Sequence, residues 1–371
     1  MPLWSIVFAL FVLATGIQLA AWWGLFARLA RWQYVPAAAA TGPLPPVSVL
    51  LCARNEAPRL AAYLPALLEQ EYAAGFEVLV LDDDSSDDTP AVLQRLQSRY
   101  AHLRVLRLSP KTSAGKKAVL TRGIAEARFG QLLFTDADCR PAGPDWLRHM
   151  AAGLARADIV LGYGPCAPAP GWLNRWTRFE TVHTAMLYFS AALAGWPYMG
   201  VGRNLGWRRE VFARSGGFAA HAGLASGDDD LLVNAAANGQ NTAVCLAPGS
   251  FMYSAGKTSW REWWRQKQRH LSAGKFYRWQ HQAALSLLAG SQIGHYFLLT
   301  ALLFSEFGMI SVVFYALRMA SALVLYWRIL RHFRDEHLVL WFPLFDAFLA
   351  IYYAVFVPRA LIKSIHLISW K

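Results

Sequence analysis

The sequence predicts an α/β domain, with a mainly parallel sheet flanked by helices, held between transmembrane helices at both ends of the chain. Of the 371 residues, 55% are hydrophobic and only 16% are charged, which is too apolar for a soluble enzyme of this size. Long apolar runs lie near both ends, whereas short strand-like and helix-like segments alternate between them. We therefore expect membrane regions at 1–30 and 281–371, a domain at 43–256, and a connecting segment at 257–280.

The first apolar run, Leu3 to Ala27, is uncharged and long enough to cross a hydrocarbon core of about 30 Å. A cleaved signal peptide is the alternative. However, no basic residue precedes the run, and its apolar stretch is too long for such a peptide. Arg28 and Arg31 follow at once, so the positive-inside rule predicts an inner-membrane anchor with the N-terminus outside and the domain in the cytoplasm.

Three apolar runs of near-spanning length follow the domain, at 283–304, 309–330 and 338–357. The loop between the last two is basic and is expected to lie inside. A crossing by the third run would then place Arg359 and Lys363 outside, against the same rule. Two alternatives remain open: the third run crosses the membrane, or it is re-entrant or interfacial. The region therefore holds two or three transmembrane helices.

The elements of the domain follow a stiff, proline-rich linker at 41–46. The expected strands are Val47–Cys52, Glu77–Leu81, Arg104–Leu108, Gln131–Thr135 and Ile159–Gly162. The expected helices are Arg59–Glu69, Pro90–Tyr100 and Lys116–Arg128, of which the second opens with a capping residue and a proline. Such sheets bind ligands beyond the carboxyl ends of their strands, so the residues after each strand are the first site candidates.

Polar side chains follow three of these strands. They are Arg54, Glu56, Asp82, Asp83, Asp136 and Asp138. Asp136 and Asp138, two apart in extended backbone, are expected to point the same way and to bind Mg²⁺ or Mn²⁺ on a diphosphate. Asp82 and Asp83 are candidates for holding a base or ribose, whereas the acidic residues after them are explained by capping of the next helix. Neither GxGxxG nor a Walker A motif occurs, which removes the two commonest phosphate cradles.

Three consecutive carboxylates, Asp228, Asp229 and Asp230, precede an apolar helical stretch. Crowded like charges raise one another's pKa, and a carboxylate perturbed in this way is suited to accept a proton from a hydroxyl. A helix N-terminal cap is an equally good interpretation. The sequence at this point leaves both open.

The connecting segment is basic and rich in Trp, which is typical of an interfacial helix. On such a helix Gln266, Arg269 and His270 share one face, and that face is positioned to close over a diphosphate or an acceptor sugar. Glu180 and His183 lie on another expected helix, and we assign them to packing.

Taken in order, six segments resemble the inverting nucleotide-sugar glycosyltransferases of family 2, which have the GT-A fold. The matching segments are Val47–Glu56, Leu81–Thr89, Gly115–Gly123, Thr135–Asp138, Gly227–Asp230 and Gln266–His270. They span most of residues 47–275. Two departures are present: the acidic pair reads Asp228-Asp229 where the family has Glu-Asp, and the family's Gln-x-x-Arg-Trp motif ends here in His270.

The resemblance implies a role for each matching residue. Arg54, Glu56 and Asp83 would line the nucleoside pocket, Lys116 would approach the phosphates, and Asp136 and Asp138 would serve the metal and donor. Asp229, with Asp228 beside it, would be the general base of a single inverting displacement. Asp230 leaves the identity of the base open by one position.

The resemblance further implies transfer of a sugar from a nucleotide-linked donor, usually uridine diphosphate, to a lipid-linked or glycan acceptor, with Mg²⁺ or Mn²⁺. Two alternatives are a processive polysaccharide synthase and a catalytically silent membrane scaffold. Nucleic acid is not expected as a partner, because the basic residues of this chain of net charge +12 gather beside the apolar runs. Membrane lipids are expected partners instead.

Overall fold

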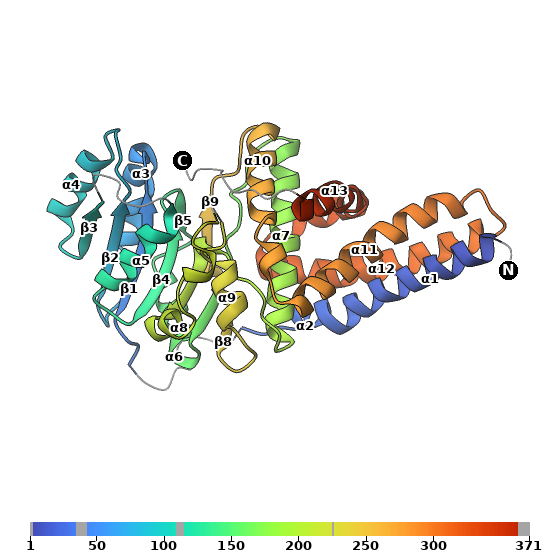
Figure 1. Cartoon of the computed structure of the whole chain (residues 1–371), viewed down its shortest axis with the longest axis horizontal. Helices are drawn as coiled ribbons and strands as arrows, with labels where there is room; N and C mark the ends of the chain where they lie inside the picture. Colours follow the sequence, from blue (N-terminus) through green and yellow to red (C-terminus); the bar gives the residue numbers. More distant parts are fainter. Residues whose placement is uncertain (1–2, 35–42, 109–114, 225, 363–371) are drawn as a thin grey trace.

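The computed structural model describes residues 3–34, 43–108, 115–224 and 226–362. An α/β domain is joined to a group of long apolar helices that extend away from it (Figure 1). Of the sequence-based expectations, Thr41, Gly42 and Lys363 lie outside the described residues. The expected fold class, a mainly parallel sheet flanked by helices with membrane-length helices at both ends, is confirmed.

The central sheet has seven strands in the order β3-β2-β1-β4-β7-β6-β8. The strands are β1 Val47–Ala53, β2 Phe76–Asp82, β3 Leu103–Arg107, β4 Gln131–Asp136, β6 Ile159–Gly162, β7 Leu205–Arg208 and β8 Thr242–Cys245. All neighbours pair in parallel except β7, which runs antiparallel to both β4 and β6. A second, two-stranded sheet pairs β5 Cys139–Pro141 with β9 Met252–Ser254. The five expected strands are present within one residue of their expected bounds, whereas β7 and β8 were not anticipated.

Strand β7 fits between β4 and β6 because it carries a glycine at its closest approach. A Cβ on Gly206 would lie 2.4 Å from Leu133 Cδ2 and 2.9 Å from Val160 Cγ1. A larger residue would therefore push the three strands apart. This short strand matters for the site, because the 3₁₀ turn Gly202–Asn204 leads directly into it.

Helices cover both faces of the sheet. They are α3 Ala57–Leu68, α4 Thr89–Arg99, α5 Lys116–Glu126, α6 Trp146–Arg156, α7 Trp172–Leu193, α8 Arg209–Arg214, α9 Asp230–Ala236 and α10 Trp260–Leu271. Helices α3 and α6 bury their apolar faces in one core. Helices α5 and α7 share the other core with the apolar helices of the chain ends. The α/β domain and the terminal helices are therefore packed as one body on that face.

Within the described residues, four helices are long and apolar enough to cross a membrane: Leu3–Ala30, Trp279–Leu302, Gly308–Phe333 and Glu336–Phe356. The first comprises α1 Leu3–Ala20, a π-helical turn Ala21–Phe26 and α2 Ala27–Ala30. The second and third are α11 Trp279–Leu302 and α12 Gly308–Phe333, and the fourth overlaps α13 Phe342–Ile362. Figure 1 shows α1, α11 and α12 side by side, pointing away from the domain. Helix α13 is foreshortened in the same view and lies between this bundle and α7.

A buried ion pair joins these helices. Arg318 of α12 is 1% exposed and forms a two-pronged contact with the carboxylate of Asp346 on α13. The same guanidinium donates to Gln292 on α11 at 2.8 Å and to Gln18 on α1 at 3.1 Å, while Tyr296 donates to Asp346 at 2.6 Å. A charge in such surroundings is tolerated only when it is paired and hydrogen-bonded, so this cluster determines how the four helices assemble.

Replacing Asp346 with Ala is expected to lower the free energy of unfolding by about 3–5 kcal/mol, because Arg318 would stay buried without its counter-charge. The double variant Arg318→Met/Asp346→Leu should recover at least half of that loss, since both buried charges are gone. Unfolding of the detergent-solubilised protein by titrated denaturant measures both values. A single variant that unfolds with wild-type free energy would contradict the assignment.

Candidate active site

A cavity of about 370 Å³ lies beyond the carboxyl ends of β1 and β4, between the sheet and helices α7 and α10. It receives side chains from strand ends, from the start of α5, from the loop before α9 and from α10. The sequence-predicted residues that line it are Arg54, Glu56, Lys116, Asp136, Asp138, Asp228, Asp229, Gln266, Arg269 and His270. The structure thus brings together residues that are up to 216 positions apart in the chain, from Arg54 to His270.

Asp82 ends β2 and Asp83 follows it, but neither lines this cavity. Both are buried, and Asp82 accepts a hydrogen bond from the Ser85 amide at 3.1 Å while its other oxygen lies 3.7 Å from Arg107 Nε. The backbone amide of Asp83 donates to Ala53 at the end of β1. In this structure Asp82 holds its own loop, and a ligand contact by either residue remains a prediction.

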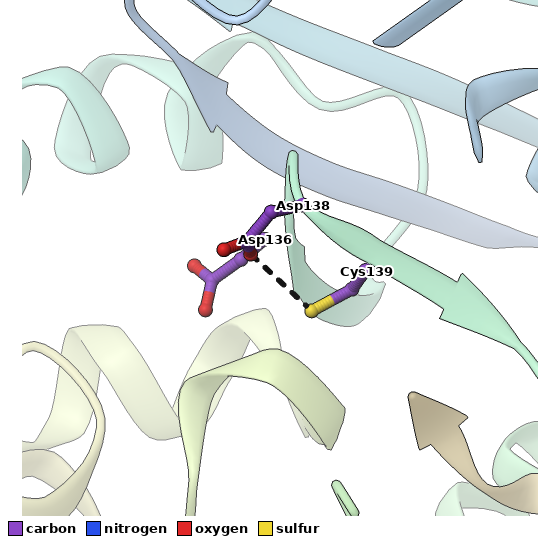
Figure 2. A group of neighbouring side chains, drawn as sticks. All are labelled: Asp136, Asp138 and Cys139. Atoms are coloured by element: carbon purple, nitrogen blue, oxygen red, sulfur yellow. Dashed lines mark hydrogen bonds between the residues drawn. The ribbon is translucent and has the colours of Figure 1, made fainter. Parts of the chain in front are cut away.

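Asp136 and Asp138 are brought together by a turn and not by extended backbone as expected. Strand β4 ends at Asp136, residues 137–138 form the turn, and β5 begins at Cys139. One oxygen of each carboxylate and the Cys139 sulfur lie within 4.8 Å of one another (Figure 2). Burial raises the pKa of the Cys139 thiol, which donates weakly to Asp138 at 3.7 Å. The two carboxylates are the hard oxygen ligands that Mg²⁺ and Mn²⁺ prefer, so this pair fits such an ion.

Lys116 lies between this pair and the second group of acids. Its Nζ is 3.1 Å from Asp136 Oδ1 and 3.0 Å from Asp228 Oδ2. Burial opposes the charge on the amine, but the charges of Asp136 and Asp228 outweigh burial and raise the pKa of Lys116 well above its usual value. The cavity therefore contains a permanent cation where the two acidic segments meet.

The structure confirms the helix-cap interpretation of Asp229, and its role as a proton acceptor stays a prediction. Its carboxylate caps α9 by accepting from the Asp230 amide at 2.8 Å, and it accepts from the Gly202 amide at 2.6 Å, at the edge of the cavity. Burial and the charge of Asp228 raise the pKa of Asp229. For Asp228, burial acts in the same direction, but Lys116 outweighs it and the pKa is lowered. Adjacent acids with opposite shifts are suited to different tasks, and Asp229 is the better proton acceptor.

The Asp230 carboxyl group is already hydrogen-bonded to Tyr277 of the same chain. Its carboxylate accepts from the Tyr277 hydroxyl at 2.7 Å and from the Leu231 amide at 2.8 Å. Burial and the charge of Asp229 raise the pKa of Asp230 to about 8. Since Tyr277 holds one oxygen and the backbone the other, Asp230 is less available than Asp229 to a substrate.

Lys117, which sequence reasoning did not single out, anchors the loop that carries the acids. Its buried Nζ donates to the carbonyl oxygens of His221 at 2.6 Å, Leu224 at 3.1 Å and Ser226 at 2.7 Å. Lys116 and Lys117 are neighbours at the start of α5, and one serves the cavity while the other holds the adjacent loop. The sequence alone did not indicate that Lys116 and Lys117 would have these different roles.

Helix α10 contributes the predicted face. Ser259 caps the helix, and Gln266, Arg269 and His270 all line the cavity, as their spacing predicts. Four further charged residues that line it were not predicted as site residues: Arg203, Lys257, Lys267 and Glu180. Arg203 donates to Ser254 at 2.9 Å across the cavity edge. Its proximity to the site depends on β7, which no local pattern had indicated.

Replacing Asp230 with Asn is expected to change how stability depends on pH. The folded protein keeps this carboxyl protonated up to about pH 8, whereas the unfolded chain releases the proton near pH 4. The contribution of Asp230 is therefore present at low pH and is lost as pH rises between these values. The Asn variant should lose less stability than the parent from pH 5 to pH 8 in thermal unfolding.

The matched control for this pH series is Asp158→Asn, which removes a part-exposed carboxylate paired with Arg208 and Arg214, outside the cavity. Its stability is expected to run parallel to that of the parent over the same range. Parallel curves for Asp230→Asn as well would contradict the raised pKa.

Comparisons with known proteins agree with this geometry. Residues 48–219 match the family model described as "Glycosyl transferase family 2". "Probable glycosyltransferase YdaM" of Bacillus subtilis (strain 168) is 27% identical over 235 residues, which cover 61% of this chain and 54% of the relative. "Beta-monoglucosyldiacylglycerol synthase" of Trichormus variabilis is 32% identical over 146 residues, 39% of this chain and 31% of that protein. The chain thus spans about half or less of the length of these curated relatives.

A solved structure has the same fold over nearly the whole chain. It is described as "Mannosyltransferase PcManGT from Pyrobaculum calidifontis in complex with GDP-Man and Mn2+". The two chains superpose with a TM-score of 0.60 at 20% identity, over 94% of this chain and 99% of the other. The likeness therefore extends beyond the α/β domain to the terminal helices.

Proposed function

Because residues 48–219 match the family model of glycosyl transferase family 2, we propose that the chain is a membrane-bound inverting glycosyltransferase of this family. It moves a sugar from a nucleotide-sugar donor to a lipid-linked or membrane-proximal acceptor. The observation that carries the proposal is the meeting of Asp136, Asp138, Lys116 and Asp229 in one cavity at the carboxyl edge of the sheet.

The donor occupies the sheet side of the cavity. Arg54 and Glu56 at the end of β1 line the nucleoside end, where Glu56 is held by Arg59 at 2.6 Å. Mg²⁺ or Mn²⁺ held by Asp136 and Asp138 would neutralise the diphosphate as it leaves. Lys116 adds a fixed positive charge beside the same carboxylates. Uridine diphosphate is the leaving group that the family resemblance favours.

Transfer occurs in a single displacement. Asp229 accepts the proton of the acceptor hydroxyl, the hydroxyl oxygen forms a bond to the anomeric carbon, and the bond from that carbon to the nucleoside diphosphate breaks. The raised pKa of Asp229 suits a base that must hold a proton after the step. Asp228, bound to Lys116, keeps its charge beside it.

The terminal helices support a membrane-borne acceptor and a cytoplasmic site. The ends of α2 and α12 nearest the domain lie together, with the rings of Trp32 and His332 5.7 Å apart. The basic residues of both ends gather there: Arg28, Arg31, Arg328, Arg331 and Arg334. By the positive-inside rule this end faces the cytoplasm, and so does the cavity. A relative named as a diacylglycerol glycolipid synthase is consistent with an acceptor in the adjoining lipid.

The proposal is tested by measuring nucleoside diphosphate release from a panel of nucleotide sugars with Mg²⁺ or Mn²⁺ and lipid acceptors. We expect one donor to react, and Asp229→Asn to lower the rate by about 10²- to 10⁴-fold because the proton acceptor is lost. Asp138→Ala should lower it as well and weaken the metal dependence. Asp158→Asn, a carboxylate outside the cavity, should retain the parent's rate.

Three results would overturn the proposal. If Asp229→Asn released nucleoside diphosphate at the wild-type rate, Asp229 would not be the base. If calorimetry detected no binding of any donor, a catalytically silent scaffold would be favoured. Long polymer formed from donor alone would favour a processive synthase over transfer of one or a few sugars.

A further inference from the structure

Helix α10 carries much of the cavity wall and packs on the core through Trp263, Trp264 and Leu271. Of its twelve residues, Trp263 alone is buried. The Trp263 ring packs against Trp176 of α7 and against Tyr352 and Phe356 of α13. A helix with one buried side chain can rotate or shift unless polar contacts restrain it.

Glu180 supplies those contacts. Its carboxylate is on α7, is 4% exposed and lines the cavity. One oxygen accepts from Lys267 Nζ at 2.7 Å and from the Tyr352 hydroxyl at 3.1 Å, and the other accepts from Trp263 Nε1 at 3.0 Å. A buried carboxylate that accepts from two other helices is a rigid joint, because Trp263 and Lys267 would lose their hydrogen-bond acceptor if α10 moved.

The two α10 donors determine the rotation of that helix. Trp263 and Lys267 are one turn apart and share a face. With that face held against Glu180, the neighbouring face carrying Gln266, Arg269 and His270 points into the cavity. A rotation of α10 that moved Trp263 and Lys267 away from Glu180 would therefore turn the face carrying Gln266, Arg269 and His270 away from the donor.

We propose that Glu180 is a positioning residue that orients α10 and so places Gln266, Arg269 and His270 against the donor. The identity of that ligand rests on the proposed function, but the orientation of α10 does not. Tyr352 extends the joint to α13, which Arg318 and Asp346 bind to the other membrane helices. The packing of the membrane helices thus reaches the cavity wall through this carboxylate and through the ring contacts of Trp263 with Tyr352 and Phe356.

The test uses the full chain in detergent and in lipid nanodiscs. Glu180→Gln keeps the size of the side chain but presents an uncharged amide to Lys267. We expect the KM for the donor to rise at least tenfold with a smaller change in kcat, because the residue orients binding groups and takes no part in the proton transfer. Tyr352→Phe, which removes one neutral donor and leaves the ion pair, should have an effect several-fold smaller.

A second readout measures α10 directly. Spin labels on Arg265→Cys, on the exposed side of α10, and on Gln97→Cys, on α4, report the distance between the helix and the sheet domain. The four native cysteines are buried, so they compete little for the label. Glu180→Gln should shift or broaden this distance distribution, and adding Lys267→Met should restore it partly by removing the unpaired cation.

The outcomes separate the two proposals. An unchanged distance distribution in Glu180→Gln overturns the positioning role, whatever happens to activity. A shifted distribution in a protein that binds no nucleotide sugar supports the joint and overturns the proposed function. Loss of kcat with unchanged KM and distance would instead assign Glu180 a direct part in the reaction, against our inference. If Glu180→Gln does not fold, the KM, the kcat and the spin-label distance are measured on Lys267→Met instead, with the same criteria.

Discussion

The site depends on one cation placed between two groups of carboxylates. Asp136 and Asp138 follow β4, and Asp228 and Asp229 precede α9, so the fold brings four acids to one edge of the sheet. Two like charges about 4 Å apart repel by roughly 4 kcal/mol at an effective dielectric constant of 20. Lys116, at the first position of α5, lies within 3.1 Å of one acid from each group. Without it, the segments could not approach so closely unless another cation or protons took its place.

The reversed strand β7 gives the acids their second support. It enters the sheet between β4 and β6, and the turn before it brings the Gly202 amide to Asp229. A Cβ on Gly202 would lie 3.1 Å from the Asp229 carboxylate, so a larger residue would crowd this contact. The carboxylate of Asp229 is thus oriented by two backbone amides while its charge is modulated by Asp228. The position of β7 in the sheet therefore determines one of the two hydrogen bonds that orient Asp229, the residue proposed as the base.

Much of this arrangement could be predicted from local sequence. Strand ends of a parallel sheet share an edge, so polar residues after β1 and β4 had to meet there, and helical spacing placed Gln266 and His270 on one face. Other residues that line the cavity could not be predicted from the local sequence. Glu180 looks like any packed polar residue of a long helix, and its value comes from Lys267, Trp263 and Tyr352, which only the tertiary fold supplies. The contact of Arg203 with the cavity likewise needs β7, a strand of four residues that alternation cannot reveal.

Helix α13 contains most of the last apolar run, which the sequence left undecided because a crossing would place Arg359 and Lys363 outside. Its residues Phe345 and Tyr352 pack on α7 and α10 of the α/β domain, while Leu344 and Ile351 are exposed. Apolar side chains buried against protein and apolar side chains facing lipid have the same composition, so a window average counts both as membrane. The helix is thus covered by the domain on one face and exposed on the other. Under the proposed function, this exposed face would lie against lipid, and the contacts of Glu180 would lie beside the layer from which a lipid acceptor enters.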